Sequence, residues 1–147
     1  MLESRAEMET AINVEFGRKL LAQQPFSVLL GAQLTVFEPG SAELVIPLRA
    51  EHLQQHGFVH GGVLSYAADN ALTFAGGSAL GPQVVTSEYK INYLRPANGE
   101  CLVARAVVVY AGKTQAVCRC AIFAVKEGQE ILSATAQGTI ARLGNQG

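Results

Sequence analysis

The stretch GGVLSYAADNALTFA, residues 61–75, decides the fold of this chain. Alanine, leucine, valine and aromatic residues occur on almost every side of the helix that it would form. A helix without a polar face is buried all round. The pair Gly76-Gly77 follows, and we expect it to end the helix. The stretch therefore predicts a central helix enclosed by the rest of the chain.

The segments around this helix have the patterns of strands. Leu29–Glu38 and Ala42–Leu48 flank Pro39-Gly40 and predict a hairpin, which a polar loop at Arg49–Val59 follows. Asn98-Gly99, later in the chain, is a strong hairpin signal. Four further strands are predicted at Gln83–Leu94, Cys101–Tyr110, Thr114–Lys126 and Glu130–Leu143.

The N-terminal residues 4–23 are predicted to form a helix that ends at Pro25. Ser4 and Glu7 fit a capping box. Apolar residues then recur at helical spacing, at Met8, Ala11, Ile12, Phe16 and Leu20.

Together these elements predict an α+β fold, in which a curved antiparallel sheet wraps round one long central helix. We expect residues 1–147 to form a single domain, with residues 1–25 as an N-terminal helical extension. A six-stranded sheet of this kind leaves an edge strand, and pairing of two such edges would form a homodimer.

Composition narrows the function classes. The 11 Lys and Arg residues nearly balance the 12 Asp and Glu residues, which disfavours binding to nucleic acid through charge. Charged residues make up 16% of the chain, against about 25% in typical domains, and this favours an oligomer that hides part of the surface. No apolar signal core or membrane span is evident, and Cys101, Cys118 and Cys120 fit buried thiols of a reducing compartment. We expect a soluble cytoplasmic protein.

Asp69 lies in the middle of the apolar helix without a Lys or Arg three or four residues away. A buried carboxylate without a partner is unfavourable. Asp69 therefore pairs with another element, faces water in a pocket, or takes part in chemistry. The segment His60-Gly61-Gly62 precedes the helix, where free N–H groups favour a developing negative charge and the glycines let a ligand approach closely.

Gly61 and Asp69 are eight residues apart, or about 12 Å along a helix. A single reacting carbon cannot contact both groups on one helix. If both act on one substrate, they come from different subunits, and the active site lies at a dimer interface. His52, His56 and His60 are spaced four apart, but Gly57 interrupts any helix through them, so we expect no metal site.

The run QQHGFVHGGVLSYAADNA, residues 54–71, closely resembles the hotdog-fold acyl-CoA thioesterases of the phenylacetate-pathway, PaaI-like, branch. INYLRPA at residues 91–97 and GKT at residues 112–114 also match the pattern of that branch. The similarity covers roughly residues 28–142. It implies a homodimer, often paired into a tetramer, that hydrolyses acyl-CoA without a metal or redox cofactor, since CoA is part of the substrate.

The resemblance also implies roles for individual residues. The backbone N–H of Gly61 would polarise the thioester carbonyl, and Asp69 of the opposite subunit would activate water or attack the carbonyl. Gln54, or its competitor Gln55, would contact the thioester or the attacking water, and His60 would help to hold the carbonyl. Thr86, or Ser87 if the register shifts, would position the water. Lys113 would contact the CoA phosphates.

The acyl group is left open by the sequence. We expect it between subunits, near Tyr66, Phe74 and the segment Val59–Val63, with Gly62 close to the substrate. Small and aromatic residues there suit a small aromatic or a short to medium aliphatic acyl group. The alternative function is a non-catalytic acyl-CoA binding or regulatory protein on the same scaffold. Such proteins typically lose the acid of the helix, which this chain keeps as Asp69.

Overall fold

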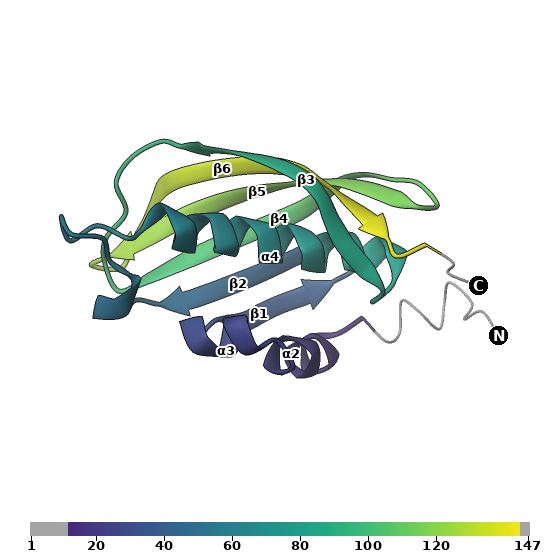
Figure 1. The fold of residues 1–147 in the computed structure, drawn as a ribbon, viewed down its shortest axis with the longest axis horizontal. Coiled ribbons are helices and arrows are strands. Elements are labelled where there is room, and N and C mark those ends of the chain that lie inside the picture. Colours follow the sequence, from purple (N-terminus) through teal and green to yellow (C-terminus); the bar gives the residue numbers. More distant parts are fainter. Residues whose placement is uncertain (1–11, 145–147) are drawn as a thin grey trace.

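A long helix, α4 (Gly61–Leu80), lies on the concave side of a six-stranded antiparallel sheet (Figure 1). The structure is a computed structural model and describes residues 12–144. The sheet has the strand order β1-β2-β4-β5-β6-β3. Its strands are β1 (Gln33–Glu38), β2 (Ser41–Pro47), β3 (Val84–Tyr93), β4 (Cys101–Ala111), β5 (Gln115–Lys126) and β6 (Gln129–Arg142). This confirms the α+β fold predicted from the sequence, with a curved sheet around one central helix.

The prediction that Gly76-Gly77 ends the central helix was wrong. α4 continues to Leu80 and ends at Gly81, whose φ of 99° is in the left-handed region. A Cβ atom at Gly76 would lie 2.6 Å from Cβ of Ile140 on β6. Gly76 is therefore needed for the close approach of the helix to the sheet, and not for a stop. Twelve residues of α4 are buried, as its apolar sequence predicts.

From residue 12 onward, the N-terminal part of the chain forms two short helices, α2 (Val14–Ala22) and α3 (Pro25–Leu30). Asn13 has extended backbone geometry, and its side chain accepts a hydrogen bond from the Phe16 N–H at 2.9 Å. The prediction of a continuous helix over residues 4–23 was therefore wrong at Asn13, which is the N-cap of α2. The predicted capping box of Ser4 and Glu7, with Met8 and Ala11, lies outside the described residues.

The prediction of a strand that begins at Leu29 was also wrong, because Leu29 belongs to α3. Pro25 begins this helix and does not only end the preceding one. Proline suits the first helical position, where its missing N–H and fixed φ do no harm. Gly31, with a φ of 76°, terminates α3 in the left-handed conformation, and β1 begins only at Gln33.

Of the two predicted hairpin turns, one is correct. Strands β1 and β2 pair around Pro39-Gly40, as expected. Asn98-Gly99 joins no hairpin, because β3 pairs with β6 and not with β4. A Cβ atom at Gly99 would lie 2.1 Å from the carbonyl oxygen of Val125, so this glycine allows a close approach to β5. The predicted loop before α4 contains a short 3-10 turn, η1 (Ala50–His52).

The two edges of the sheet differ. Helix α2 packs against the edge strand β1, where Gly17 is so close that an added Cβ would lie 2.4 Å from Leu34 Cδ2. The other edge strand, β3, keeps Val85 46% and Tyr93 54% exposed. Strand β3 is thus the edge that a second sheet can reach.

Of the three cysteines predicted to be buried, Cys118 and Cys120 on β5 are buried, whereas Cys101 on β4 is only partly buried. Burial raises the pKa of Cys118 to about 11 and that of Cys120 to about 12. Both side chains therefore remain protonated thiols at neutral pH. Within residues 12–144, no helix has the length and apolar character that crossing a membrane requires.

Candidate active site

One face of α4 runs along the edge strand β3 in the opposite direction. At the start of α4, the Tyr93 hydroxyl donates a hydrogen bond to the carbonyl oxygen of Gly61 at 3.1 Å. Four residues later, the Ser65 and Tyr89 hydroxyl groups are hydrogen bonded to each other. After four more residues, Asp69 meets Thr86. Residues four apart share a helix face, so Gly61, Ser65 and Asp69 all face the open edge of the sheet.

The carboxylate of Asp69 is partly exposed and held by hydroxyl groups. Thr86 Oγ1 donates to Asp69 Oδ1 at 2.6 Å. Thr73 Oγ1 donates to the backbone oxygen of Asp69 at 2.7 Å and lies 2.9 Å from Thr86 Oγ1. The sequence left open whether Asp69 pairs with another element, faces water or takes part in chemistry. The structure shows that its carboxylate pairs with β3, through the hydroxyl group of Thr86 and not through a cation. Asp69 Oδ2 has no hydrogen-bond partner among residues 12–144 and is free to meet a substrate or water.

The structure places Thr86, and not Ser87, beside this acid. The pairing of β3 with β6 shifts its register between Thr86 and Glu88, and the side chain of Ser87 is exposed. A bulge at this position re-aims the side chains of the strand. It explains why alternation along the sequence alone could not decide between the two hydroxyl residues.

At the N-terminus of α4, the backbone N–H groups of Gly61 and Gly62 differ in their hydrogen bonding. His60 is the N-cap, and its Nδ1 accepts a hydrogen bond from the Gly62 N–H at 2.8 Å. The N–H of Gly61 has no acceptor within the described part of the chain. When Nδ1 accepts, the neutral ring carries its proton on Nε2. Gly61 N–H and His60 Nε2 are therefore two hydrogen-bond donors at the positive end of the helix dipole.

Gln54 shapes the loop before the helix. Its side-chain oxygen accepts from the N–H groups of His56, at 2.5 Å, and of Phe58, at 3.3 Å. These bonds occupy the oxygen, while no described residue accepts from the amide NH₂ group. Gln54 is partly buried, whereas its competitor Gln55 is exposed.

Two predicted substrate contacts are not part of the hydrogen-bonded row along β3. The Tyr66 hydroxyl donates to Ser27 Oγ of α3 at 2.6 Å, and burial raises the pKa of Tyr66. Lys113 belongs to the turn between β4 and β5, at the end of the molecule where α4 ends, far from Gly61 (Figure 1). Within residues 12–144, neither side chain is hydrogen bonded to Asp69 or Gly61.

The three spaced histidines do not converge. His52 is buried, its Nδ1 accepts from the Arg49 N–H at 3.0 Å, and its Nε2 lies 2.9 Å from the carbonyl oxygen of Leu30. His60 caps α4 and is exposed. Between residues 12 and 144, no group of three or more His, Cys, Asp and Glu side chains is arranged to hold a metal ion.

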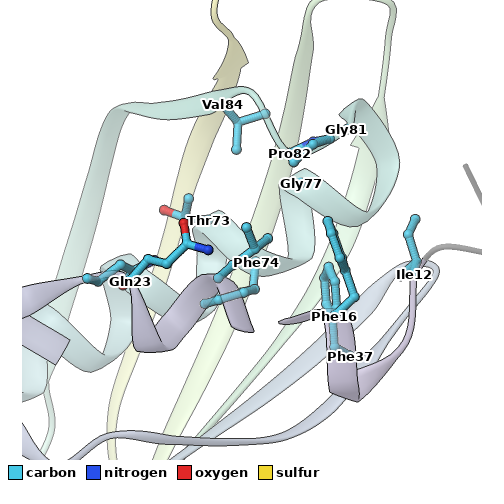
Figure 2. A pocket seen from close by; sticks show the side chains of 12 residues that line it. Ile12, Phe16, Gln23, Phe37, Thr73, Phe74, Gly77, Gly81, Pro82 and Val84 are labelled. Atoms are coloured by element: carbon cyan, nitrogen blue, oxygen red, sulfur yellow. The ribbon is translucent and has the colours of Figure 1, made fainter. Parts of the chain in front are cut away.

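The sequence predicted Phe74 near the acyl group, but not the cavity that this residue lines one helical turn beyond Asp69. Its volume is about 480 Å³, and side chains of α2 and α4 face each other across it (Figure 2). Its lining residues are Ile12, Phe16, Leu20, Gln23, Gln24, Phe37, Thr73, Phe74, Gly77, Gly81, Pro82 and Val84. They are brought together only by the tertiary fold. Thr73 could have been found from its position four residues after Asp69.

Comparison with known proteins agrees with this geometry. The model of the thioesterase superfamily matches residues 56–131. A protein of Archaeoglobus fulgidus, described as a candidate esterase, is 33% identical over 116 residues, which are 78% of this chain and 73% of that protein.

Two solved structures of similar fold are also similar in sequence. A thioesterase family protein from Silicibacter pomeroyi has a TM-score of 0.82 and 38% identity, covering 86% of this chain and 94% of its own. The PaaI protein of Escherichia coli, from the phenylacetic acid degradation operon, has a TM-score of 0.77 and 28% identity, covering 87% and 91%. The predicted resemblance is confirmed: the chain belongs to the thioesterase superfamily, has its hotdog fold and is a thioester hydrolase.

Proposed function

We propose that this protein is an acyl-CoA thioesterase that hydrolyses a small aromatic or a short to medium-chain acyl-CoA to the free acid and CoA. The observation that carries the proposal is the face of α4 along β3. This face has a free backbone donor at Gly61 and a carboxylate at Asp69, held by Thr86. A donor and a base or nucleophile are the two groups that hydrolysis of a thioester requires.

In the proposed reaction, the Gly61 N–H and the Nε2–H of His60 stabilise the negative charge that develops on the carbonyl oxygen. Asp69 takes a proton from water, which attacks the carbonyl carbon, or attacks that carbon itself to give a mixed anhydride that water then cleaves. A C–O bond forms, the C–S bond breaks, and the thiolate of CoA takes up a proton. Thr86 positions the carboxylate, and Gln54 contributes its free NH₂ group near the thioester. No step requires a metal or redox cofactor.

The distance between the two groups supports a shared site. Because α4 is continuous from Gly61 to Asp69, these residues are about 12 Å apart along its axis. Within one protomer, a single carbonyl group cannot meet both. We therefore place Gly61 of one protomer and Asp69 of the other on each substrate.

The open edge strand offers a way to bring the two groups together. Along β3, Tyr93 lies at Gly61 and Thr86 lies at Asp69. If two β3 strands pair in antiparallel fashion about a twofold axis near Tyr89 and Lys90, Thr86 of one protomer lies opposite Tyr93 of the other. This pairing would carry Asp69 toward the Gly61 of the second protomer. Two such dimers would form the tetramer that the resemblance implies.

The test is release of free thiol from a panel of acyl-CoAs, both aromatic and C4 to C16, by the wild type and by Asp69→Asn. Hydrolysis that depends on Asp69 is expected, and the preferred member identifies the acyl group. If the wild type binds acyl-CoA but releases thiol from no member of the panel, the acyl-CoA thioesterase proposal fails and the protein is a binding protein.

A further inference from the structure

We infer that the cavity between α2 and α4 holds the tail of the acyl group, and that the N-terminal extension selects an uncharged, apolar tail. The inference rests on the proposed function, because it starts from a thioester bound at Asp69. It adds a specificity element that lies outside the face shared by Gly61 and Asp69.

The cavity begins one helical turn beyond the acid, at Thr73. On α4, Thr73 lies one turn after Asp69 and Gly77 lies one turn after Thr73, and both of these residues line the cavity. Thr73 is hydrogen bonded to the backbone oxygen of Asp69, so the cavity begins about one helical turn, or roughly 5 Å, from this acid. An acyl chain whose carbonyl lies at Asp69 can therefore extend along α4 into the cavity.

The lining determines the chemistry of the tail. Its side chains are mainly aliphatic and aromatic, and no described lining residue is charged. The polar side chains are Thr73, Gln23 and Gln24, of which Gln24 already accepts a hydrogen bond from Ser27 Oγ at 2.6 Å. A charged group at the end of the acyl chain would lose its water here without gaining an opposite charge. An uncharged apolar tail has no charged group to desolvate, and burial of its apolar surface favours binding.

The described part of the extension, α2 and α3, is a fixed wall and not a loose cover. On one side, Gly17 allows α2 to pack tightly on β1, and Arg18 Nε donates to the carbonyl oxygen of Leu34 at 2.9 Å. On the other side, α3 is tied to α4 through Ser27, which accepts from the Tyr66 hydroxyl at 2.6 Å. The walls of the cavity are therefore preformed, and its volume of about 480 Å³ is within the usual range of small-molecule sites.

Two substitutions on opposite walls test the inference by changing the cavity in opposite directions. A Cβ atom at Gly77 would lie 3.5 Å from Val84 Cγ2, an ordinary contact, so Gly77→Leu can project into the cavity and shorten it. Leu20→Ala enlarges it from α2. The readout is the ratio of kcat/KM for octanoyl-CoA to that for butyryl-CoA. We expect Gly77→Leu to lower this ratio about tenfold or more and Leu20→Ala to raise it, since one methylene in an apolar pocket is worth about tenfold or more.

The wild type supplies a second comparison, between hexanoyl-CoA and adipyl-CoA, which have six carbons each but differ in a terminal carboxylate. We expect hexanoyl-CoA to be preferred at least about tenfold. Equal rates for this pair, or ratios that stay constant or move in the same direction in both variants, would overturn the inference. That failure differs from failure of the proposed function, in which no acyl-CoA is hydrolysed in a manner that depends on Asp69.

Discussion

Two faces of helix α4 differ in composition and in what they contact. One face, the sheet face, consists of small and apolar residues that are fully buried in the core, among them Ala67, Ala71 and Leu72. The face toward β3 carries Gly61 and Asp69, which remain partly exposed and contact hydroxyl groups. The first face supplies apolar burial, which stabilises the fold. The second adds little burial, so its polar groups are best explained by chemistry. Substitutions on the two faces should therefore separate stability from activity.

The largest effect is expected for Asp69→Asn on the β3 face. Hydrolysis should fall by about 10²–10⁴, because the amide can neither take a proton from water nor attack the carbonyl. The amide oxygen can still accept the hydrogen bond from Thr86, so the midpoint of thermal unfolding should change little. Steady-state thiol release and thermal unfolding give the two readouts. Full activity together with a lower melting temperature would assign Asp69 to packing and remove the contrast.

The next effect concerns the backbone of the same face, tested with Gly61→Pro. Proline removes the N–H and is well suited to the first position of a helix, and the ψ of 136° at His60 is compatible with a following proline. Loss of one such donor should reduce kcat by about 10²–10³. Gly61→Ala is the matched control, because it keeps the N–H and its Cβ would make only an ordinary contact, 3.5 Å from Tyr93. Equal rates for the two variants would exclude the N–H as the active group.

On the sheet face, Leu72→Ala should show the opposite behaviour. Leu72 has no exposed surface, and truncation of such a side chain should lower the free energy of unfolding by about 2–5 kcal/mol. The kcat of the folded enzyme should stay near that of the wild type, since Leu72 is fully buried in the core and cannot reach the substrate. Urea unfolding and kinetics on the same preparation measure both quantities. A large fall in kcat at unchanged stability would show that the two faces are not independent.

The smallest effect is expected for Thr86→Val, which removes the hydroxyl that donates to Asp69 at 2.6 Å. A hydrogen bond to a charged group is worth roughly 1.5–3 kcal/mol, so kcat should fall about tenfold while KM changes little. Thr86→Ser keeps the hydroxyl and should restore most of the rate. If the serine variant were as slow as the valine variant, the shape of the side chain and not its hydrogen bond would be responsible.

The same contrast explains how much could be predicted from the sequence. The apolar circumference of residues 61–75 and the turn at Pro39-Gly40 are local patterns, and they correctly predicted that a central helix and the first hairpin form. Asp69 was identified because a carboxylate among apolar residues conflicts with burial. The family, the fold and the thioester hydrolase activity followed from the run of residues 54–71.

The errors arose where a residue has two uses that only tertiary structure distinguishes. Gly76 permits contact with Ile140, and Gly99 permits contact with Val125, yet glycines at such places also mark helix ends and hairpins. Pro25 both ends one helix and begins the next. The choice of Thr86 over Ser87, and the cavity between α2 and α4, depend on a bulge and on contacts between distant segments, which no local pattern encodes.

The central claim is that each active site takes Gly61 from one protomer and Asp69 from its partner. The most direct measurement is the activity of a heterodimer of Gly61→Pro and Asp69→Asn protomers, carrying different affinity tags and purified through both. In a twofold dimer, one site of this heterodimer combines both substitutions and the other has neither. We predict about half of the wild-type kcat for each heterodimer, while both variant homodimers are nearly inactive. A heterodimer as inactive as the homodimers would contradict the shared site.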